Sequence, residues 1–254
     1  MPPAHIKIET GENLRPRLRL GLLIPSSNTV MEYEFSIMRP KDATVHVARI
    51  PLREVTISEL IKMEKEIKDQ ALRLADAKVD VIGFGCTSGS LFRGLGHDKK
   101  IVLKIEKATK TPAVATAGAV VEALSFLNIA RVSVATPYTE EINALERKFL
   151  EENGFVVQKM KGLNIRDNLE IGEQSPETVG NLVKEVDTPQ ADGIFVSCTN
   201  IPTIGVITHL EEELKKPVVS SNTATMWAML RKIGYVKPIT GFGRLLSMPH
   251  TECA

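Results

Sequence analysis

Two stretches of the chain, VDVIGFGCTSGS at Val79–Ser90 and ADGIFVSCTNIPT at Ala191–Thr203, decide the fold. Each is an apolar run with β-branched residues that ends in a cysteine, and each cysteine is followed by a threonine. A short apolar run bounded by small and polar residues is typical of a strand buried in a sheet. Cys86 and Cys198 therefore occupy corresponding places, 112 positions apart.

Other landmarks recur at nearly the same offset and in the same order. LRLGLLIPSSN at Leu18–Asn28 is echoed by ARVSVATPYTE at Ala130–Glu140, and TPAVATAGA at Thr111–Ala119 by KPVVSSNTA at Lys216–Ala224. We interpret the chain as two similar halves, each presenting one thiol. Two matched thiols suggest a reaction that uses both sides of a small substrate.

Apolar runs alternate with stretches of helical spacing along both halves. The expected strands are Leu18–Ile24, Thr44–Ile50, Val79–Gly85, Ala113–Thr116, Val132–Thr136, Phe155–Met160, Ile194–Ser197 and Val218–Ser220. Thr56 and Glu59 form a capping-box pattern before one expected helix. Such alternation predicts βαβ units, and hence an α/β fold of two doubly wound halves, each with a parallel four-stranded sheet. Ligands of such sheets bind at the carboxyl ends of strands, where both cysteines stand.

Composition narrows the class of protein. The 254 residues are 43% hydrophobic and 25% charged, with a formal net charge of +1, so neither nucleic acid nor an acidic membrane is expected as a partner. No apolar run approaches the about 20 residues of a membrane span, and the polar start does not resemble a signal peptide. The three cysteines lack metal-ligand spacing. We therefore expect a reducing, cytoplasmic setting and no metal.

Cys86 is expected directly after its strand and just before a helix. The helix dipole and free N–H groups there would lower the thiol pKa, and the amides of Thr87, Ser88 and Gly89 could cradle a carboxylate or an enolate. The alternative is that a free cysteine acts only as a small buried apolar side chain. Two cysteines at equivalent strand ends favour the catalytic interpretation.

Three weaker candidates lie in loops. Ser26 and Asn28 follow the first strand, and their hydroxyl and amide could hold a carboxylate or simply cap the next helix. Tyr138 occupies the equivalent place in the second half, where its phenol could donate to an oxyanion or merely pack. Asp167-Asn168 is expected in a loop, as a binding pair or a turn.

Three motifs together resemble one enzyme family. GLLIPSSNTVMEYE at Gly21–Glu34, CTSGS at Cys86–Ser90 and SCTNIPT at Ser197–Thr203 are similar to motifs of maleate cis–trans isomerases. These enzymes belong, with arylmalonate decarboxylases, to the aspartate/glutamate racemase superfamily. The resemblance covers roughly Leu18–Leu246. Arylmalonate decarboxylases keep only the second cysteine, so Cys86 argues against simple decarboxylation.

The resemblance implies roles for individual positions. Cys86 would be the nucleophile and Cys198 its partner across a cleft between the halves. The remaining implied positions are Asn28, Tyr138 and Asn168 for substrate carboxylates, and Thr87, Ser88 and Thr199 for a polar cradle. The resemblance also implies no metal or organic cofactor, and a homo-oligomer, dimeric or larger.

The resemblance further implies that the helix after each fourth strand packs on the opposite half. We accordingly expect one domain of residues 17–117 plus about 223–246, another of residues 118–222, and loose termini at 1–16 and 247–254. The expected activity is isomerisation of a small unsaturated dicarboxylate, maleate to fumarate. The alternatives are a two-cysteine racemase or epimerase, a related decarboxylase, and a non-catalytic ligand-binding module.

Overall fold

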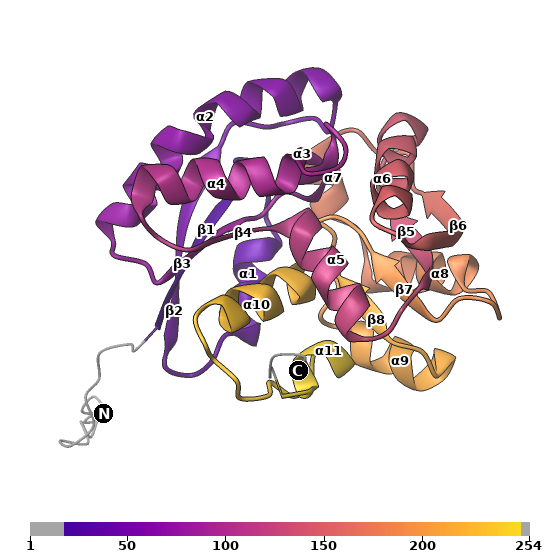
Figure 1. Cartoon of the computed structure of the whole chain (residues 1–254). Coiled ribbons are helices and arrows are strands. Elements are labelled where there is room, and N and C mark those ends of the chain that lie inside the picture. Colours follow the sequence, from indigo (N-terminus) through magenta and orange to yellow (C-terminus); the bar gives the residue numbers. More distant parts are fainter. Residues whose placement is uncertain (1–17, 250–254) are drawn as a thin grey trace, which may run out of the picture.

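Two sheets of four parallel strands form the framework of the molecule (Figure 1), a computed structural model that describes residues 18–249. Their strand orders, β2-β1-β3-β4 and β6-β5-β7-β8, repeat the same arrangement. The strands are β1 (Leu18–Pro25), β2 (Ala43–Ile50), β3 (Val81–Phe84), β4 (Ala113–Ala115), β5 (Arg131–Thr136), β6 (Val156–Gly162), β7 (Gly193–Val196) and β8 (Val218–Ser220). The predicted α/β class with two matched parallel sheets is confirmed.

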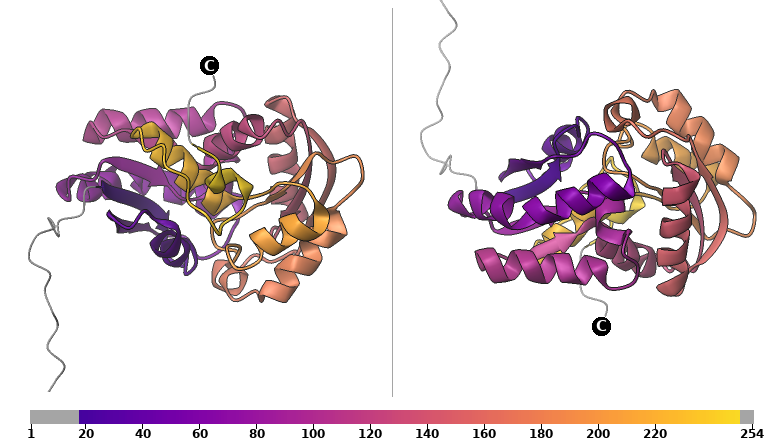
Figure 2. Two further views of the ribbon diagram at one scale, coloured as in Figure 1. Left: turned by 90° about the horizontal axis from the view of Figure 1, so that it is seen from below. Right: turned by 90° about the horizontal axis from the view of Figure 1, so that it is seen from above.

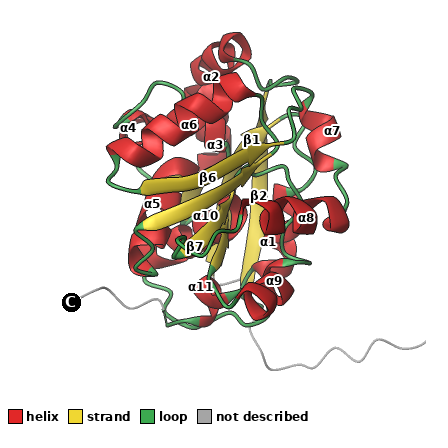
Figure 3. Ribbon diagram, turned by 90° about the vertical axis from the view of Figure 1, so that its right-hand side faces the viewer, coloured by secondary structure: helices red, strands yellow, loops and turns green. Residues whose placement is uncertain are grey.

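Helices join the strands. They are α1 (Met31–Met38), α2 (Ile57–Asp76), α3 (Thr87–Leu91), α4 (His97–Thr109), α5 (Thr116–Phe126), α6 (Glu140–Glu152), α7 (Asn168–Gly172), α8 (Pro176–Val186), α9 (Ile207–Leu214), α10 (Ser221–Lys232) and α11 (Arg244–Ser247). In the first half, α2 and α4 pack on one face of the sheet and α1 and α10 on the other. In the second half, α6 lies on one side of the strands and α8 on the other (Figure 3). Both sheets are therefore covered, which explains their apolar strands.

The helices α5 and α10 pack against each other at the centre of the molecule (Figure 2). Although α10 follows β8 of the second sheet, it lies against β3 and β4 of the first, and α5 contacts β8. The approach is close: a Cβ at Gly83 of β3 would lie 2.5 Å from Met229 Sδ of α10. These contacts support our proposal that about 223–246 belong with residues 17–117, and 118–222 form the other domain. The loose termini that we expected lie almost wholly outside the described residues, although Ser247 ends α11.

Local details differ from the sequence-based expectation in several places, and helices α9 and α11 were not predicted. Helix α4 was not predicted, and α5 begins at Thr116, earlier than expected. Asp167 and Asn168 begin helix α7 instead of lying in a loop, because the Asp167 carboxylate accepts the first free N–H groups of the helix. Only half of the capping box forms, since Thr56 Oγ1 accepts from the Glu59 N–H while the Thr56 N–H donates to the Glu54 carbonyl.

Candidate active site

The two cysteines stand at matching ends of central strands. Cys86 follows β3 by two residues and Cys198 follows β7 by two residues, and both side chains are buried. The hydroxyl of Ser221, the first residue of α10, joins the two turns: it accepts from Thr87 Oγ1 at 2.8 Å and from the Cys198 N–H at 3.1 Å. Each half therefore delivers its thiol to one shared interior.

Cys86 caps the N-terminus of α3. Its sulfur accepts from the Gly89 N–H at 3.3 Å and lies 3.8 Å from Ser88 Oγ. Burial nevertheless raises the pKa of the Cys86 thiol to about 11, because loss of water outweighs these two hydrogen bonds. The expectation of a lowered pKa for Cys86 is thus wrong. The Gly89 N–H and the Ser88 hydroxyl favour a thiolate, but they do not compensate for its desolvation.

Cys198 lies in an unusual backbone conformation. Its φ of 98° is one that residues with a side chain rarely adopt, and such strain is common at functional sites. Its sulfur accepts from the Asn200 N–H at 3.3 Å. Burial raises the pKa of the Cys198 thiol to about 12, while a hydrogen bond with the buried Tyr138 lowers it. Tyr138 is therefore a neighbour of Cys198, and burial also raises its own pKa.

Asn28 and Thr199 connect the two halves. Asn28 Oδ1 accepts from the N–H groups of Val30 and Met31, and its Nδ2 donates to Thr199 Oγ1 at 3.1 Å. Thr199 Oγ1 in turn donates to the carbonyl of Gly85, next to Cys86. Asn28 thus has one amide hydrogen engaged in the protein and one left for a ligand.

The remaining predicted positions divide into two groups. Thr87 and Ser88 are buried beside Cys86. Asn168 is buried and donates from Nδ2 to Ser27 Oγ at 2.8 Å. Ser26, by contrast, is exposed and exchanges hydrogen bonds with the backbone of Leu52, so the structure does not bring it to the thiols.

Sequence reasoning missed three residues that hold the halves together. Ser221 is the bridge described above. Asn200 Oδ1 accepts from the N–H groups of Thr29 and Val30, so a residue of the second half caps α1 of the first. The buried Glu34 of α1 accepts from Thr203, Ile204 and Asn222, all of the second half or its following helix. No sequence signal marks these residues beyond their place in the repeated motifs.

A fourth missed residue, Glu146, lies in α6 behind Cys198. It is fully buried, and its Oε1 accepts from Ser197 Oγ at 2.6 Å. Burial raises the pKa of Glu146 to about 7. One turn earlier, Asn143 accepts from Thr136 Oγ1 and donates to the Tyr138 carbonyl. Helix α6 therefore supports both Tyr138 and the residue before Cys198.

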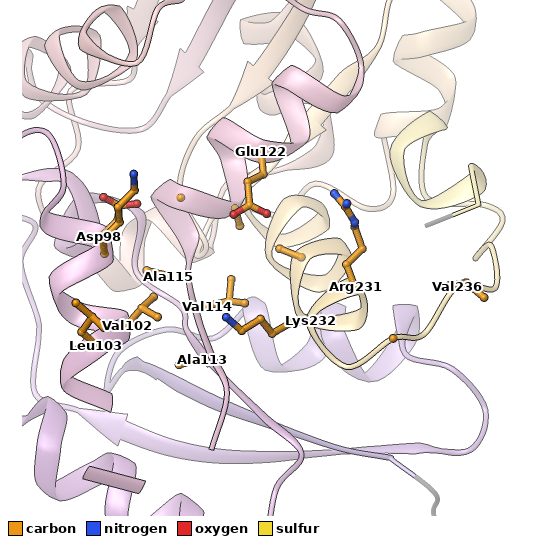
Figure 4. A pocket seen from close by; sticks show the side chains of 15 residues that line it. Asp98, Val102, Leu103, Ala113, Val114, Ala115, Glu122, Arg231, Lys232 and Val236 are labelled. Carbon is orange, nitrogen blue, oxygen red and sulfur yellow. The ribbon is translucent and has the colours of Figure 1, made fainter. Parts of the chain in front are cut away.

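A cavity of about 750 Å³ lies elsewhere, between α4, β4, α5 and α10 (Figure 4). Asp98, Glu122, Arg231 and Lys232 line it, and neither cysteine does. We place the candidate active site at the thiols, because no thiol or hydroxyl side chain lines the cavity and its charges are of both signs. Within residues 18–249, no group of three or more His, Cys, Asp or Glu side chains could hold a metal ion. Over the same range, every helix is too short or too polar to cross a membrane.

A family model described as arylmalonate decarboxylase matches residues 20–246. The maleate isomerase of Pseudomonas putida is 33% identical over 242 residues, which are 90% of this chain and 97% of that protein. A variant of the maleate isomerase Iso from Pseudomonas putida S16, solved with maleate, is similar with a TM-score of 0.88 and 30% identity, covering 91% of this chain and 97% of that one. A cysteine variant of the Nocardia farcinica maleate cis–trans isomerase, with a covalently bound succinylcysteine intermediate, gives 0.88 at 27% identity, covering 91% and 98%.

Proposed function

The chain belongs to the arylmalonate decarboxylase family, and from its similarity to maleate isomerases we propose that it is an isomerase that converts maleate to fumarate. The observation that carries the proposal is the pair of buried thiols at matching strand ends, joined through Ser221. Several relatives that cover about 90% of the chain are maleate isomerases, and the structure of one of them holds a succinyl group on a cysteine, while an arylmalonate decarboxylase covers a similar share. We therefore infer a reaction in which one thiol adds to the alkene and the other transfers a proton.

The proposed reaction begins at Cys86. Its thiolate adds to one alkene carbon of maleate, forming a carbon–sulfur bond, and the π electrons move to the other carbon and its carboxylate as an enediolate. Cys198 gives its proton to that carbon, the former double bond rotates as a single bond, and Cys198 takes a proton back. Loss of the Cys86 thiolate then re-forms the double bond in the trans geometry. Covalent addition replaces one high rotation barrier with smaller steps.

Amide and hydroxyl groups would hold the two carboxylates. Asn28 and Asn168 each donate one side-chain hydrogen to the protein and keep one for the substrate. Tyr138 offers its phenol beside Cys198. Thr87, Ser88 and Thr199 would surround the enediolate with further donors. Donors fixed in a water-excluded site stabilise developing charge more than water does.

The reaction sequence balances in atoms and electrons with the two thiols alone, so we propose that it needs no cofactor. Two catalytic thiols need a reducing compartment, which supports a cytoplasmic location. We also propose a homodimer or larger assembly, to be checked by light scattering of the purified protein.

Proton NMR of maleate incubated with the purified protein tests the function. Fumarate should appear with the wild type and not with Cys86→Ser. A folded wild-type protein that leaves maleate unchanged would overturn the assignment. Exchange of an α-hydrogen of a chiral carboxylic acid in deuterated water would instead favour a two-thiol racemase.

A further inference from the structure

Glu146 is a buried carboxyl group that the proposed reaction does not use. It projects from α6 and is fully buried. Its Oε1 accepts one hydrogen bond, from Ser197 Oγ, and its buried Oε2 has no partner. Ser197 directly precedes Cys198. The group therefore lies against the backbone that carries one of the two thiols.

Glu34, a second almost fully buried glutamate, provides a comparison within the same molecule. Its Oε1 accepts from the backbone N–H groups of Thr203 and Ile204, and its Oε2 accepts from Asn222 Nδ2 at 2.7 Å. Several donors of this kind are what a buried carboxylate needs to stay charged, whereas a carboxyl group with one donor is better accommodated as the neutral acid. Burial raises the pKa of both glutamates, but Glu34 has several donors that favour its charged form, whereas Glu146 has one.

No cation approaches Glu146 from the elements packed around it, among the residues that the structure describes. Lys159 and Lys161 of β6 both bond to Glu185, and Arg147 of α6 bonds to the Val157 carbonyl and pairs with Glu151. The titratable groups on the inner side are Cys198, Tyr138 and Cys86, the last at the start of α3. A negative charge on Glu146 makes Cys198 and Tyr138 harder to ionise. A negative Glu146 would therefore oppose a thiolate at Cys198 without any compensating charge.

We propose that Glu146 is a positioning residue that the protein keeps as a neutral acid, and that the proton it holds is a condition for the ionisation of Cys198. Two unpaired negative charges in one dry interior repel strongly. With a proton on Oε2, the carboxyl group still accepts from Ser197 and adds no charge. The proposal rests on the proposed function only in that Cys198 takes part in turnover.

The pH range of the effect follows from the same surroundings. Burial raises the pKa of Glu146 to about 7, and the hydrogen bond from Ser197 lowers it. Glu146 therefore loses its proton near pH 7, and above that pH the rate at which Cys198 reacts should be lower than it would be without the charge on Glu146.

Alkylation of Cys198 by iodoacetamide tests this without any turnover. Rates are measured from pH 6 to 9 in the Cys86→Ser background, with peptide mass spectrometry to separate Cys198 from Cys253. The ratio of rates, Glu146→Gln over Glu146, should rise several-fold across this range, with its midpoint near pH 7. The matched control is Glu152→Gln on the solvent side of the same helix, whose ratio should stay at one. An identical ratio at every pH for Glu146→Gln would overturn the proposal.

A second variant covers the case in which Glu146→Gln does not fold. Ser197→Ala removes the one donor to Glu146, so the bend in the pH–rate profile of Cys198 should move to higher pH; an unmoved bend would contradict the proposal. Because alkylation reports on the thiol itself, the outcome is independent of whether maleate is turned over. A protein that fails to isomerise maleate but shows the shifted profile would lose the proposed function and keep this inference.

Discussion

Gly89 sets how closely the backbone approaches the sulfur of Cys86. The Gly89 N–H donates to Sγ at 3.3 Å, and a Cβ at residue 89 would lie 2.9 Å from that sulfur and would also press on Met63. We expect Gly89→Ala to displace the thiol and lower kcat on maleate by about 10- to 100-fold, as misplacement by about 1 Å does in other sites. The temperature of thermal unfolding should fall only modestly, because the Met63 side chain that the Cβ presses on is flexible and alanine is compatible with the helix. A fully active Gly89→Ala protein would contradict the role given to this amide.

The buried carboxyl group of Glu146 should make the free energy of unfolding depend on pH. Its pKa is raised from the unfolded value of 4.5 to about 7, so the folded state binds the proton more tightly than the unfolded state. The resulting stability is fully present below about pH 4.5 and is lost as the pH rises to about 7, a loss of about 3 kcal/mol. The Glu146→Gln variant should lack this loss. Urea unfolding of both proteins at pH 5, 6, 7 and 8 would measure it, and parallel pH curves would show that Glu146 does not titrate there.

At the scale of single residues, the sequence predicts the two thiols but not their ionisation. Cys86 and Cys198 could be found because both follow repeated apolar strands. The direction of their pKa shifts could not be predicted, because it depends on desolvation by side chains that only the fold brings around the thiols. Tyr138 was found by its place in the repeat, whereas its contact with Cys198 needed the fold.

Helix α1 fastens the first half to the turn after β7. Glu34 of this helix is held by donors from Thr203, Ile204 and Asn222. Glu34→Gln would place an amide N–H₂ where these donors converge, and we expect a loss of about 2–4 kcal/mol of unfolding free energy. Urea denaturation measures it. Glu32→Gln, two residues earlier in the same helix and half exposed, is the control and should cost under about 1 kcal/mol.

Strands and most helices could be predicted because their signals are local. The inward spacing of Leu60, Met63 and Ile67 predicted α2, and the buried runs predicted all eight strands. Helix α4 was missed because its start, after Gly94 and Gly96, resembles a polar loop. Both glycines have φ near 80°, a left-handed conformation that glycine adopts easily, and they form the turn between α3 and α4.

At the scale of the molecule, Ser221 couples the two halves through their cysteine turns. Ser221→Ala would leave the Cys198 N–H and the Thr87 hydroxyl without their shared partner in a buried place. We expect a loss of about 1–3 kcal/mol of unfolding free energy and a fall in kcat of about tenfold or more. Denaturation and steady-state kinetics on maleate measure both. Ser125→Ala, an exposed helical serine, should change neither quantity.

The repeat in the sequence predicted two facing halves, but not the bonds between them. The hydrogen bonds that link the halves through Ser221, Asn200 and Glu34 join residues 134 to 188 positions apart in the chain. Only folding brings such partners together. The same holds for the central packing of α5 on α10, which we could expect only from the family resemblance.

The central claim is that Cys86 adds covalently to maleate while Cys198 handles the proton. Intact-protein and peptide mass spectrometry of the Cys198→Ser variant, incubated with maleate and quenched, tests it most directly. We predict a mass increase equal to one maleic acid, located on the peptide that contains Cys86, and no such adduct in Cys86→Ser. An adduct on another peptide, or none at all while the wild type still forms fumarate, would contradict the account.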